Sequence, residues 1–445
     1  MLRSMEATII IVTVLSIFPL YLGSLLGMRF IVLAIILVRP SCDLVFDVTK
    51  SVLGETSVGP GAVANALIVG LAFLYFLQTP VLLGSATLSM WAGFLITALA
   101  SIMVSPEPGT AARGVFWLTT YVAVFALPFA LIRSKESALR CLTVALYSSF
   151  LPVAYGFVEL VFGNTETEDG LRLQSTFSHP NIFAFYLVGV FALTLFLLNS
   201  NRVSLSSRVQ GFLIAYQPVL IFLIVLTKSR SAWAGTGVLL SVMIGLVNRR
   251  YLWLLLLAPL ILLIPGIAER FFDVGTEIPS YRYARLNSYA WRELLWRDTL
   301  EWMSANPAPL LGHGLNSFVE FVTLFFPAAR ESGGAGIGPH NALLQIYFEL
   351  GLLGLITFAW LFVSLFLKLK DGYWSDKRGS MIIMALVLAH LVESYSDNMF
   401  DYLSYQWFFW FLMGTMCAWN RCYSASYEVP KAGLFKQNLL AKGSA

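Results

Sequence analysis

Apolar runs of about 20 residues, the length that a helix needs to cross a bilayer, recur along the whole chain. The pattern predicts an all-α polytopic integral membrane protein with about 12 transmembrane helices. A further apolar run at 28–40 is too short to cross a bilayer cleanly. The expected spans are 7–26, 62–78, 83–104, 113–133, 139–162, 180–198, 211–227, 232–248, 251–267, 341–368, 380–397 and 403–420.

Lysine and arginine gather in alternate short loops, which normally face the cytoplasm. The long polar segment then lies on the other side of the membrane. The expected parts of the chain are an N-terminal transmembrane bundle at 1–267, one large folded helical loop outside the cytoplasm at 268–340, C-terminal transmembrane helices at 341–420 and a cytoplasmic tail at 421–445. The basic loop residues are Arg133, Lys135, Arg140, Arg202, Arg208, Arg249, Arg250, Lys368, Lys370, Lys377, Arg378 and Arg421.

One amphipathic helix is expected inside the outer loop, at 288–304. Trp291, Leu294 and Trp302 fall on an apolar stripe at helical spacing, and charged residues lie largely opposite. This pattern is typical of a helix lying on or near a membrane surface. Asn306, followed by Pro-Ala-Pro, ends the helix. Tryptophans of this helix are expected at the bilayer interface, or stacked on sugar rings.

Two cations stand where the distribution of basic residues predicts none. The segment Thr227-Lys-Ser-Arg-Ser231 forms a tight turn between two spans on the outer side. Arg230 fits a bound anionic headgroup, because a guanidinium grips phosphate through two hydrogen bonds. The alternative is that Arg230 reaches lipid phosphates without a specific ligand.

His340 and Asn341 stand where the outer loop enters the next long apolar helix. A helix N-terminus carries partial positive charge and unpaired N–H groups, so it attracts anions and disfavours imidazolium. A neutral His340 beside a captured phosphate fits a general base. The alternative is that His340 and Asn341 only cap the helix. Farther along this helix, Glu349 either orients an arginine or hydrogen-bonds to a neighbouring helix.

Further arginines in the outer loops complete the candidate set. Arg292 lies on the amphipathic helix, and Arg285 precedes it. A charge on such a helix is more often part of a solvated face than a ligand. Arg172 lies just before the span at 180–198, which His179 or Asn181 is expected to cap.

Composition narrows the class of protein. Hydrophobic residues make up 58% of the 445 and charged residues only 12%, against about 25% charged in soluble domains. A soluble enzyme and a disordered chain are therefore excluded, and a net charge of +4 supplies no basic field for nucleic acid. The four cysteines are scattered, and no phosphate loop, dinucleotide-binding turn or zinc motif is present. No metal, cofactor or nucleotide donor is expected.

Taken together, the motifs between residues 170 and 420 resemble the O-antigen ligase and polymerase superfamily. This superfamily contains Wzy-type polysaccharide polymerases and lipopolysaccharide O-antigen ligases. His313 departs from the family pattern, in which a small apolar residue is usual. The motifs that carry the resemblance are, in order, Ser178-His-Pro-Asn181, Thr227-x-Ser-Arg230, Arg292-x-x-x-Trp296, Pro309-Leu-Leu-Gly-His-Gly314, Asn316-Ser-Phe318 and His340-Asn341 followed by Gly351-x-x-Gly354.

The resemblance implies metal-independent glycosyl transfer on the periplasmic face of the bacterial inner membrane. The implied donor is a glycan on undecaprenyl pyrophosphate, and the acceptor is another lipid-linked glycan or lipid A-core. Membrane lipid and a chain-length regulator are further expected partners, and nucleic acid is not. By motif, His340 would deprotonate the acceptor hydroxyl. The expected substrate-binding residues are Arg230 and Arg292, which would hold the pyrophosphate, and Arg172, Arg285, Asn341 and Glu349.

Three functions remain open at this point. Likeness to exopolysaccharide polymerases around Arg39-Pro-Ser-Cys-Asp43 and Gly59-Pro-Gly61 favours a polymerase over an O-antigen ligase. A transporter or flippase for a lipid-linked sugar is the third reading, and it predicts charged residues deep inside several spans. Glu349 and Glu393 are the clearest such charges, whereas most ionisable residues gather at one membrane face.

Overall fold

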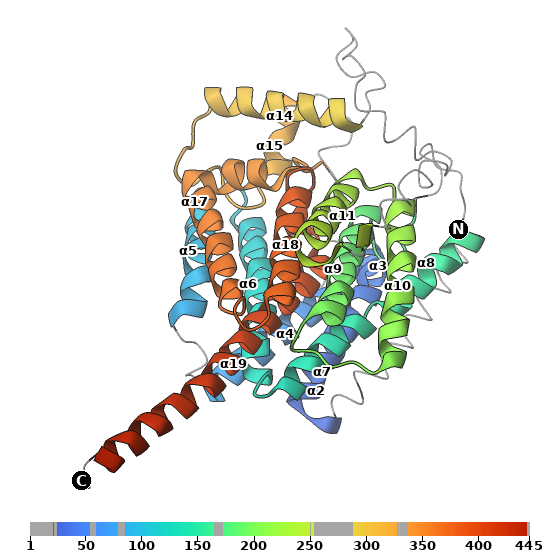
Figure 1. The fold of residues 1–445 in the computed structure, drawn as a ribbon. Helices are drawn as coiled ribbons and strands as arrows, with labels where there is room; N and C mark the ends of the chain where they lie inside the picture. The colour runs from blue at the N-terminus through green and yellow to red at the C-terminus, as the bar shows by residue number, and fades with distance from the viewer. Residues whose placement is uncertain are drawn as a thin grey trace.

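A computed structural model describes residues 21, 25–53, 59–78, 85–163, 172–249, 251–252, 288–326, 329 and 337–442, and the regular elements within them are all helical (Figure 1). The elements are α2 (Met28–Val38), η1 (Arg39–Ser41), α3 (Asp43–Leu53), α4 (Pro60–Gln78), α5 (Ser85–Ser101), α6 (Pro108–Leu131), α7 (Lys135–Tyr147), α8 (Phe150–Phe162), α9 (Pro180–Asn199), α10 (Ser207–Leu226), α11 (Arg230–Val242), η3 (Met243–Val247), α14 (Ser288–Ala305), α15 (Phe318–Phe325), α17 (Ala342–Lys370), α18 (Lys377–Ser394), η5 (Met399–Asp401) and α19 (Leu403–Lys442).

Seven helices among the described residues are long and apolar enough to cross a membrane. The all-α membrane class is thereby supported. The expected spans at 83–104, 380–397 and 403–420 coincide with α5, α18 and α19, which are shorter or more polar. Most of 7–26 and 251–267 lies outside the described residues, so the count of about 12 stays a prediction. The seven spans are Pro60–Gln78, Pro108–Leu131, Lys135–Phe162, Pro180–Asn199, Ser207–Leu226, Arg230–Val247 and Ala342–Lys370.

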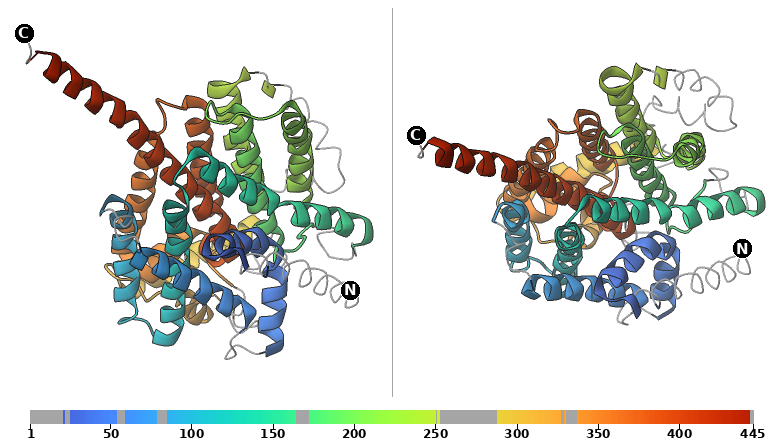
Figure 2. Two further views of the ribbon diagram at one scale, coloured as in Figure 1. Left: turned by 90° about the horizontal axis from the view of Figure 1, so that it is seen from below. Right: turned by 60° about the horizontal axis from the view of Figure 1, so that its bottom comes forward.

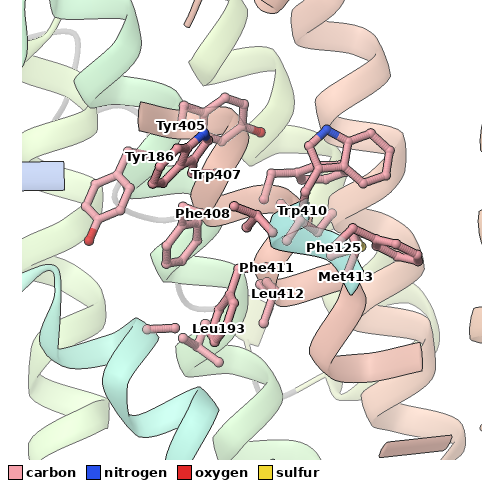
Figure 3. Close-up of a cluster of buried hydrophobic side chains, with 14 of the residues drawn as sticks. Phe125, Tyr186, Leu193, Tyr405, Trp407, Phe408, Trp410, Phe411, Leu412 and Met413 are labelled. Atoms are coloured by element: carbon pink, nitrogen blue, oxygen red, sulfur yellow. The ribbon is translucent and has the colours of Figure 1, made fainter. Parts of the chain in front are cut away.

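The centre of the bundle is built on α9 and the first half of α19. α9 is apolar on every face and is almost entirely buried, as expected of a helix surrounded by others. Aromatic side chains of α19 fill the space between α9 and α6 (Figure 3). Tyr186 meets Phe408 edge-on at 4.8 Å, and Gly189 leaves the room that the Phe408 ring occupies. The second half of α19 projects away from the bundle (Figure 2).

The ambiguous run at 28–40 becomes a short helix rather than a span. α2 covers only 11 residues, and Pro40 lies in the 3₁₀ turn η1 that leads into α3. Asp43, at the start of α3, accepts hydrogen bonds from both the backbone N–H and the hydroxyl of Ser178, at 3.1 and 2.9 Å. The N-terminal helices are therefore tied directly to the segment that opens α9.

The expected span at 341–368 coincides with α17, which is long and apolar enough to cross a membrane, but the helix is not straight. Gly351 has φ +65° and breaks α17 into two segments, which run in different directions in Figure 1. The segment at 309–314 covers the exposed backbone: the N–H of His313 donates to the Phe348 carbonyl, and that of Leu352 to the Pro309 carbonyl, at 2.9 and 2.8 Å. A side chain at Gly351 would meet the Leu310 backbone at 2.5 Å. This glycine therefore makes a bend in α17.

The amphipathic helix predicted at 288–304 is confirmed as α14, which ends at Ala305, just before Asn306. Its apolar face is not spread on a membrane, however. Leu294 and Leu295 are buried against α15 and Phe348, and Trp302 stacks on Phe348 with the ring centroids 5.6 Å apart. α14 lies across one end of the bundle, at the top of Figure 1.

Candidate functional site

Several helix ends meet beneath α14, and hydrogen bonds between distant segments hold them together. Arg172, before α9, donates from Nε to the Thr227 carbonyl of the turn that leads into α11, at 3.2 Å. Asn181, in the first turn of α9, donates from Nδ2 to Asp397 at 2.6 Å. Asp397 belongs to the loop between α18 and α19. The Ser178–Asn181 and Thr227–Arg230 motifs therefore lie close to the loop between α18 and α19.

His340 is fixed through its backbone. Its φ is +47°, in the left-handed region, and its N–H donates to Oδ1 of Asn398 at 2.6 Å. Gly338 is required nearby, because a Cβ there would lie 2.2 Å from the Asn398 side chain. Asn341 is the residue that caps α17, since Oδ1 accepts from the N–H groups of Leu343 and Leu344, both at 3.0 Å. The imidazole of His340 is thus not used for capping.

The imidazole of His340 is half-buried beneath α14. The Trp291 ring meets it edge-on, with the centroids 5.6 Å apart. Nδ1 is buried without a hydrogen-bond partner, which leaves Nε2 as the nitrogen with access to a substrate. Burial, and then Arg292 and His179, lower the pKa of His340 to about 3. The ring is therefore neutral at ordinary pH and can accept a proton.

Arg292 is the cation at the centre of this cluster. It lies close enough to act electrostatically on His340, His179 and Asp397. One turn later on α14, Trp296 donates from Nε1 to the Pro339 carbonyl at 2.7 Å. That bond fixes α14 to the residue next to His340, so the helix presents Arg292 to the site and not only to solvent. Trp291 and Trp296 are half-buried and pack partly on protein, and their expected place at the bilayer interface stays a prediction.

A polar chain runs behind these residues. Arg172 donates from a terminal guanidinium nitrogen to Oδ1 of Asn181 at 3.1 Å, and Asn181 binds Asp397. Asp397 also accepts from the Tyr402 hydroxyl and, at 3.2 Å, from the Asn398 N–H. Burial raises the pKa of Asp397, and Arg292 opposes that rise. The carboxylate is thus held within a network of donors rather than left free to take up a substrate proton.

His179 is the N-cap of α9, as one of the two alternatives predicted. Its Nδ1 accepts from the Asn181 N–H at 3.1 Å, and its ring stacks on Tyr402 with the centroids 6.4 Å apart. Partial burial, and then Arg172 and Arg292, lower the pKa of His179 to about 4. A second neutral imidazole thus stands near His340.

Arg230 opens α11 and lies at the same end of the bundle as the Arg172–Thr227 contact. The turn before it is built by Lys228, which has φ +53° and is buried. The structure thus places Arg230 at a helix N-terminus, a position that favours anions. Arg285 lies outside the described residues.

Among the described residues, no arginine is a partner of Glu349. It sits at the end of the first segment of α17, next to the bend at Gly351, and is buried. Its carboxylate lies against the backbone N–H groups of Asn316 and Phe318 and against the Gln345 side chain. Glu349 therefore braces the bend against the preceding loop, and of the two roles expected for it the bond to a neighbouring segment is the one observed.

Three residues of the site escaped the sequence analysis: Asp397, Asn398 and Tyr402. The signal available for them is a polar run, Ser-Asp-Asn-Met-Phe-Asp, between two apolar helices. Its link to His340 depends on the packing of helices that are remote in sequence. Sequence spacing alone therefore does not reveal it.

The arrangement suits an anion and a proton transfer. Cations from three segments, Arg172, Arg230 and Arg292, lie at one end of the bundle, where α9 and α11 begin and neutral histidines stand beside them. Among the described residues, no three His, Cys, Asp or Glu side chains lie close enough together to hold a metal ion. Charge stabilisation in such a site comes from guanidinium groups and helix N-termini.

Comparison with known proteins agrees with this picture. Residues 218–359 match the family model described as O-Antigen ligase (Wzy_C), and the match runs from the second half of α10 into the second segment of α17. The match includes Arg230, Arg292 and His340 and confirms the resemblance to the O-antigen ligase and polymerase superfamily. No curated protein matches the chain.

Proposed function

We propose that this O-antigen ligase-like membrane protein polymerises lipid-linked oligosaccharide repeat units of an exopolysaccharide or O-antigen. The donor is a glycan on undecaprenyl pyrophosphate, and the reaction takes place on the periplasmic face of the inner membrane. The observation that carries the proposal is the position of His340, whose Nε2 is accessible beside Arg292 at a meeting point of helix N-termini.

The proposed reaction is a displacement at the anomeric carbon of the donor. A hydroxyl oxygen of the acceptor forms the new C–O bond, and the bond from the anomeric carbon to the pyrophosphate oxygen breaks. The leaving pyrophosphate keeps the electron pair, and the hydroxyl proton passes to Nε2 of His340. Atoms and charge balance without a metal or a nucleotide.

Arginines stabilise the leaving group in this scheme. Arg292 and Arg230 hold the pyrophosphate through paired N–H donors, and the N-terminus of α11 adds its partial positive charge. Pyrophosphate is already a good leaving group, so the site mainly positions the reactants and stabilises the developing charge. Arg172 supports the site through Asn181 and Asp397.

The base differs from that of a serine-hydrolase triad. No described carboxylate accepts a hydrogen bond from Nδ1 of His340, and the backbone bond to Asn398 fixes the residue instead. Without an anionic partner the imidazole stays a weak base. A weak base suits a proton that becomes acidic only as the acceptor oxygen attacks.

The choice of polymerase over O-antigen ligase rests on likeness in the N-terminal helices. There Arg39 pairs with Asp43 at 3.5 Å, and Asp43 binds Ser178 next to His179. This contact connects the N-terminal helices, which carry the likeness, to the segment that opens α9. An O-antigen ligase that transfers glycan to lipid A-core is the alternative.

The glycan profile of a strain lacking the gene tests this choice. Electrophoresis of lipopolysaccharide is compared with size analysis of secreted polysaccharide. Loss of polymer, with single repeat units still reaching their acceptor, supports a polymerase. Full-length polymer stranded on its polyprenyl carrier supports a ligase. Normal profiles in both assays contradict a role in envelope glycan assembly.

A further inference from the structure

His179 presents one of its two ring nitrogens as a hydrogen-bond donor. The backbone N–H of Asn181 donates to Nδ1 of His179 at 3.1 Å, so Nδ1 carries the lone pair. In the neutral imidazole the proton is then on Nε2. His179 is exposed although its ring stacks on Tyr402, and no described residue accepts a hydrogen bond from Nε2. The cap of α9 therefore fixes the tautomer of His179 and leaves one N–H group available.

The same cap keeps the ring of His179 neutral. A second proton would have to bind Nδ1, which could then no longer accept from the Asn181 N–H, so protonation would cost α9 its cap. Burial lowers the pKa of His179 to about 4, and Arg172 and Arg292 act in the same direction. His179 is therefore a donor at Nε2, and it cannot serve as a base while the cap is intact.

The charges around this donor favour an anion as its acceptor. Arg172 and Arg292 are the charged groups that act most strongly on the His179 ring. Arg292 is half-buried, and no described residue accepts a hydrogen bond from its guanidinium group. Two donor side chains without an acceptor thus stand close to each other in a positively charged part of the site. A phosphate oxygen has both the charge and the lone pairs to accept from them.

We propose that His179 binds the donor pyrophosphate together with Arg230 and Arg292, through a hydrogen bond from its Nε2–H to a phosphate oxygen. The inference rests on the proposed function, because that function supplies the pyrophosphate. The two imidazoles of the site then differ in role: His340 takes up a proton, and His179 donates a hydrogen bond to the leaving group.

Two substitutions separate the donor of His179 from its cap. His179→Asn places an amide oxygen where Nδ1 lies, so α9 keeps its cap, but no donor of the shorter side chain reaches as far as Nε2. His179→Gln extends an amide N–H₂ group toward the position of Nε2, so the donor is kept and the cap is lost. Each variant is therefore the control for the other.

The test is the Kd for undecaprenyl pyrophosphate, titrated into the purified full-length protein in detergent, with undecaprenol as the lipid that lacks phosphate. We expect His179→Asn to raise the Kd for the pyrophosphate about tenfold or more and to leave Tm unchanged. His179→Gln should bind it nearly as tightly as the unaltered protein and should lower Tm by about 1–2 °C. The affinity for undecaprenol should be the same in all three proteins.

Equal Kd values for the pyrophosphate in the unaltered protein and in His179→Asn would overturn the inference. So would a His179→Gln protein that binds it as weakly as His179→Asn does, or a matching loss of affinity for undecaprenol. An unaltered protein that binds the pyrophosphate no better than undecaprenol would contradict the proposed function, and this inference with it. The two failures are distinguishable, because the first appears only in the variants and the second already in the unaltered protein.

Discussion

The backbone N–H of His340 donates a 2.6 Å hydrogen bond to Oδ1 of Asn398, 58 residues farther along the chain. The bond ties the entrance of α17 to the loop between α18 and α19. His340 also has φ +47°, a conformation that a residue other than glycine keeps only when its surroundings impose it. The candidate base is therefore positioned by a loop that is distant in sequence and carries Asp397.

Removing the acceptor on Asn398 should misplace the base. We expect Asn398→Leu to lower kcat for transfer about tenfold or more, because small displacements of a catalytic group are costly. Asn398→Asp keeps an oxygen at the same position and should restore most of the rate. Equal activity in the Leu and Asp variants would show that the bond does not position His340.

Lysine should not replace the arginines that bind the anion. Arg230→Lys and Arg292→Lys retain the charge but lose the paired donors, a loss of about 1.5–3 kcal/mol for a hydrogen bond to a charged group. Transfer should fall about tenfold to a hundredfold.

The matched control for this pair of variants is Arg297→Lys, on an exposed part of α14, which should behave like the unaltered protein. Initial rates at low donor concentration measure the effect. Equal transfer rates for all three lysine variants would show that Arg230 and Arg292 do not bind the pyrophosphate through paired hydrogen bonds.

The pH profile should report the low pKa of His340. Burial, Arg292 and His179 lower this pKa to about 3, so the imidazole is neutral throughout the range above pH 5. Acidification from pH 7.5 to 5.5 should not protonate it. A plot of kcat/KM should show no descending acid limb with a midpoint near 6.5, the ordinary value.

Arg292 contributes to the lowered pKa through its charge. Arg292→Gln should therefore raise the midpoint of any acid limb, in addition to reducing the rate. A wild-type limb at pH 6.5 that this variant leaves unmoved would argue against a buried His340 next to Arg292.

Gly351 should be indispensable to the fold. Its φ of +65° and the 2.5 Å approach of the Leu310 backbone exclude a Cβ. Gly351→Ala should destabilise the protein by at least about 1–3 kcal/mol, the usual strain of such a conformation, and lower Tm in detergent. Gly237→Ala, on α11 where nothing lies within 4 Å, should change little. Similar Tm values for the two variants would contradict the bend.

Much of this architecture is legible in the sequence because it is local. The apolar runs place α6, α9 and α10, and the periodicity from Ser288 places α14 almost to the residue. The sequence also singles out His340, Arg230 and Arg292, because each is an ionisable residue at or near the end of a predicted helix. In the same way, Asn341 is recognisable as the start of α17.

The rest depends on contacts between segments far apart in the chain. The break at Gly351 requires the 309–314 segment to supply backbone partners, and the glycine spacing fits a packed helix equally well. Asp397 and Asn398 reach the site only because α18 and α19 pack so that the loop between them lies beside His340. The contacts of Trp291 with His340 and of Trp296 with Pro339 likewise depend on which segments α14 packs against.

The most direct test of the central claim is a transfer assay with the purified protein in detergent. The substrate is a single repeat unit on undecaprenyl pyrophosphate, without added metal or nucleotide. We predict that the unaltered protein makes a ladder of longer lipid-linked glycans and releases undecaprenyl pyrophosphate. We also predict that His340→Ala makes neither, while His313→Phe, a change of an imidazole packed among aromatic rings, keeps both activities. A ladder formed by the His340→Ala protein at the normal rate would contradict the account.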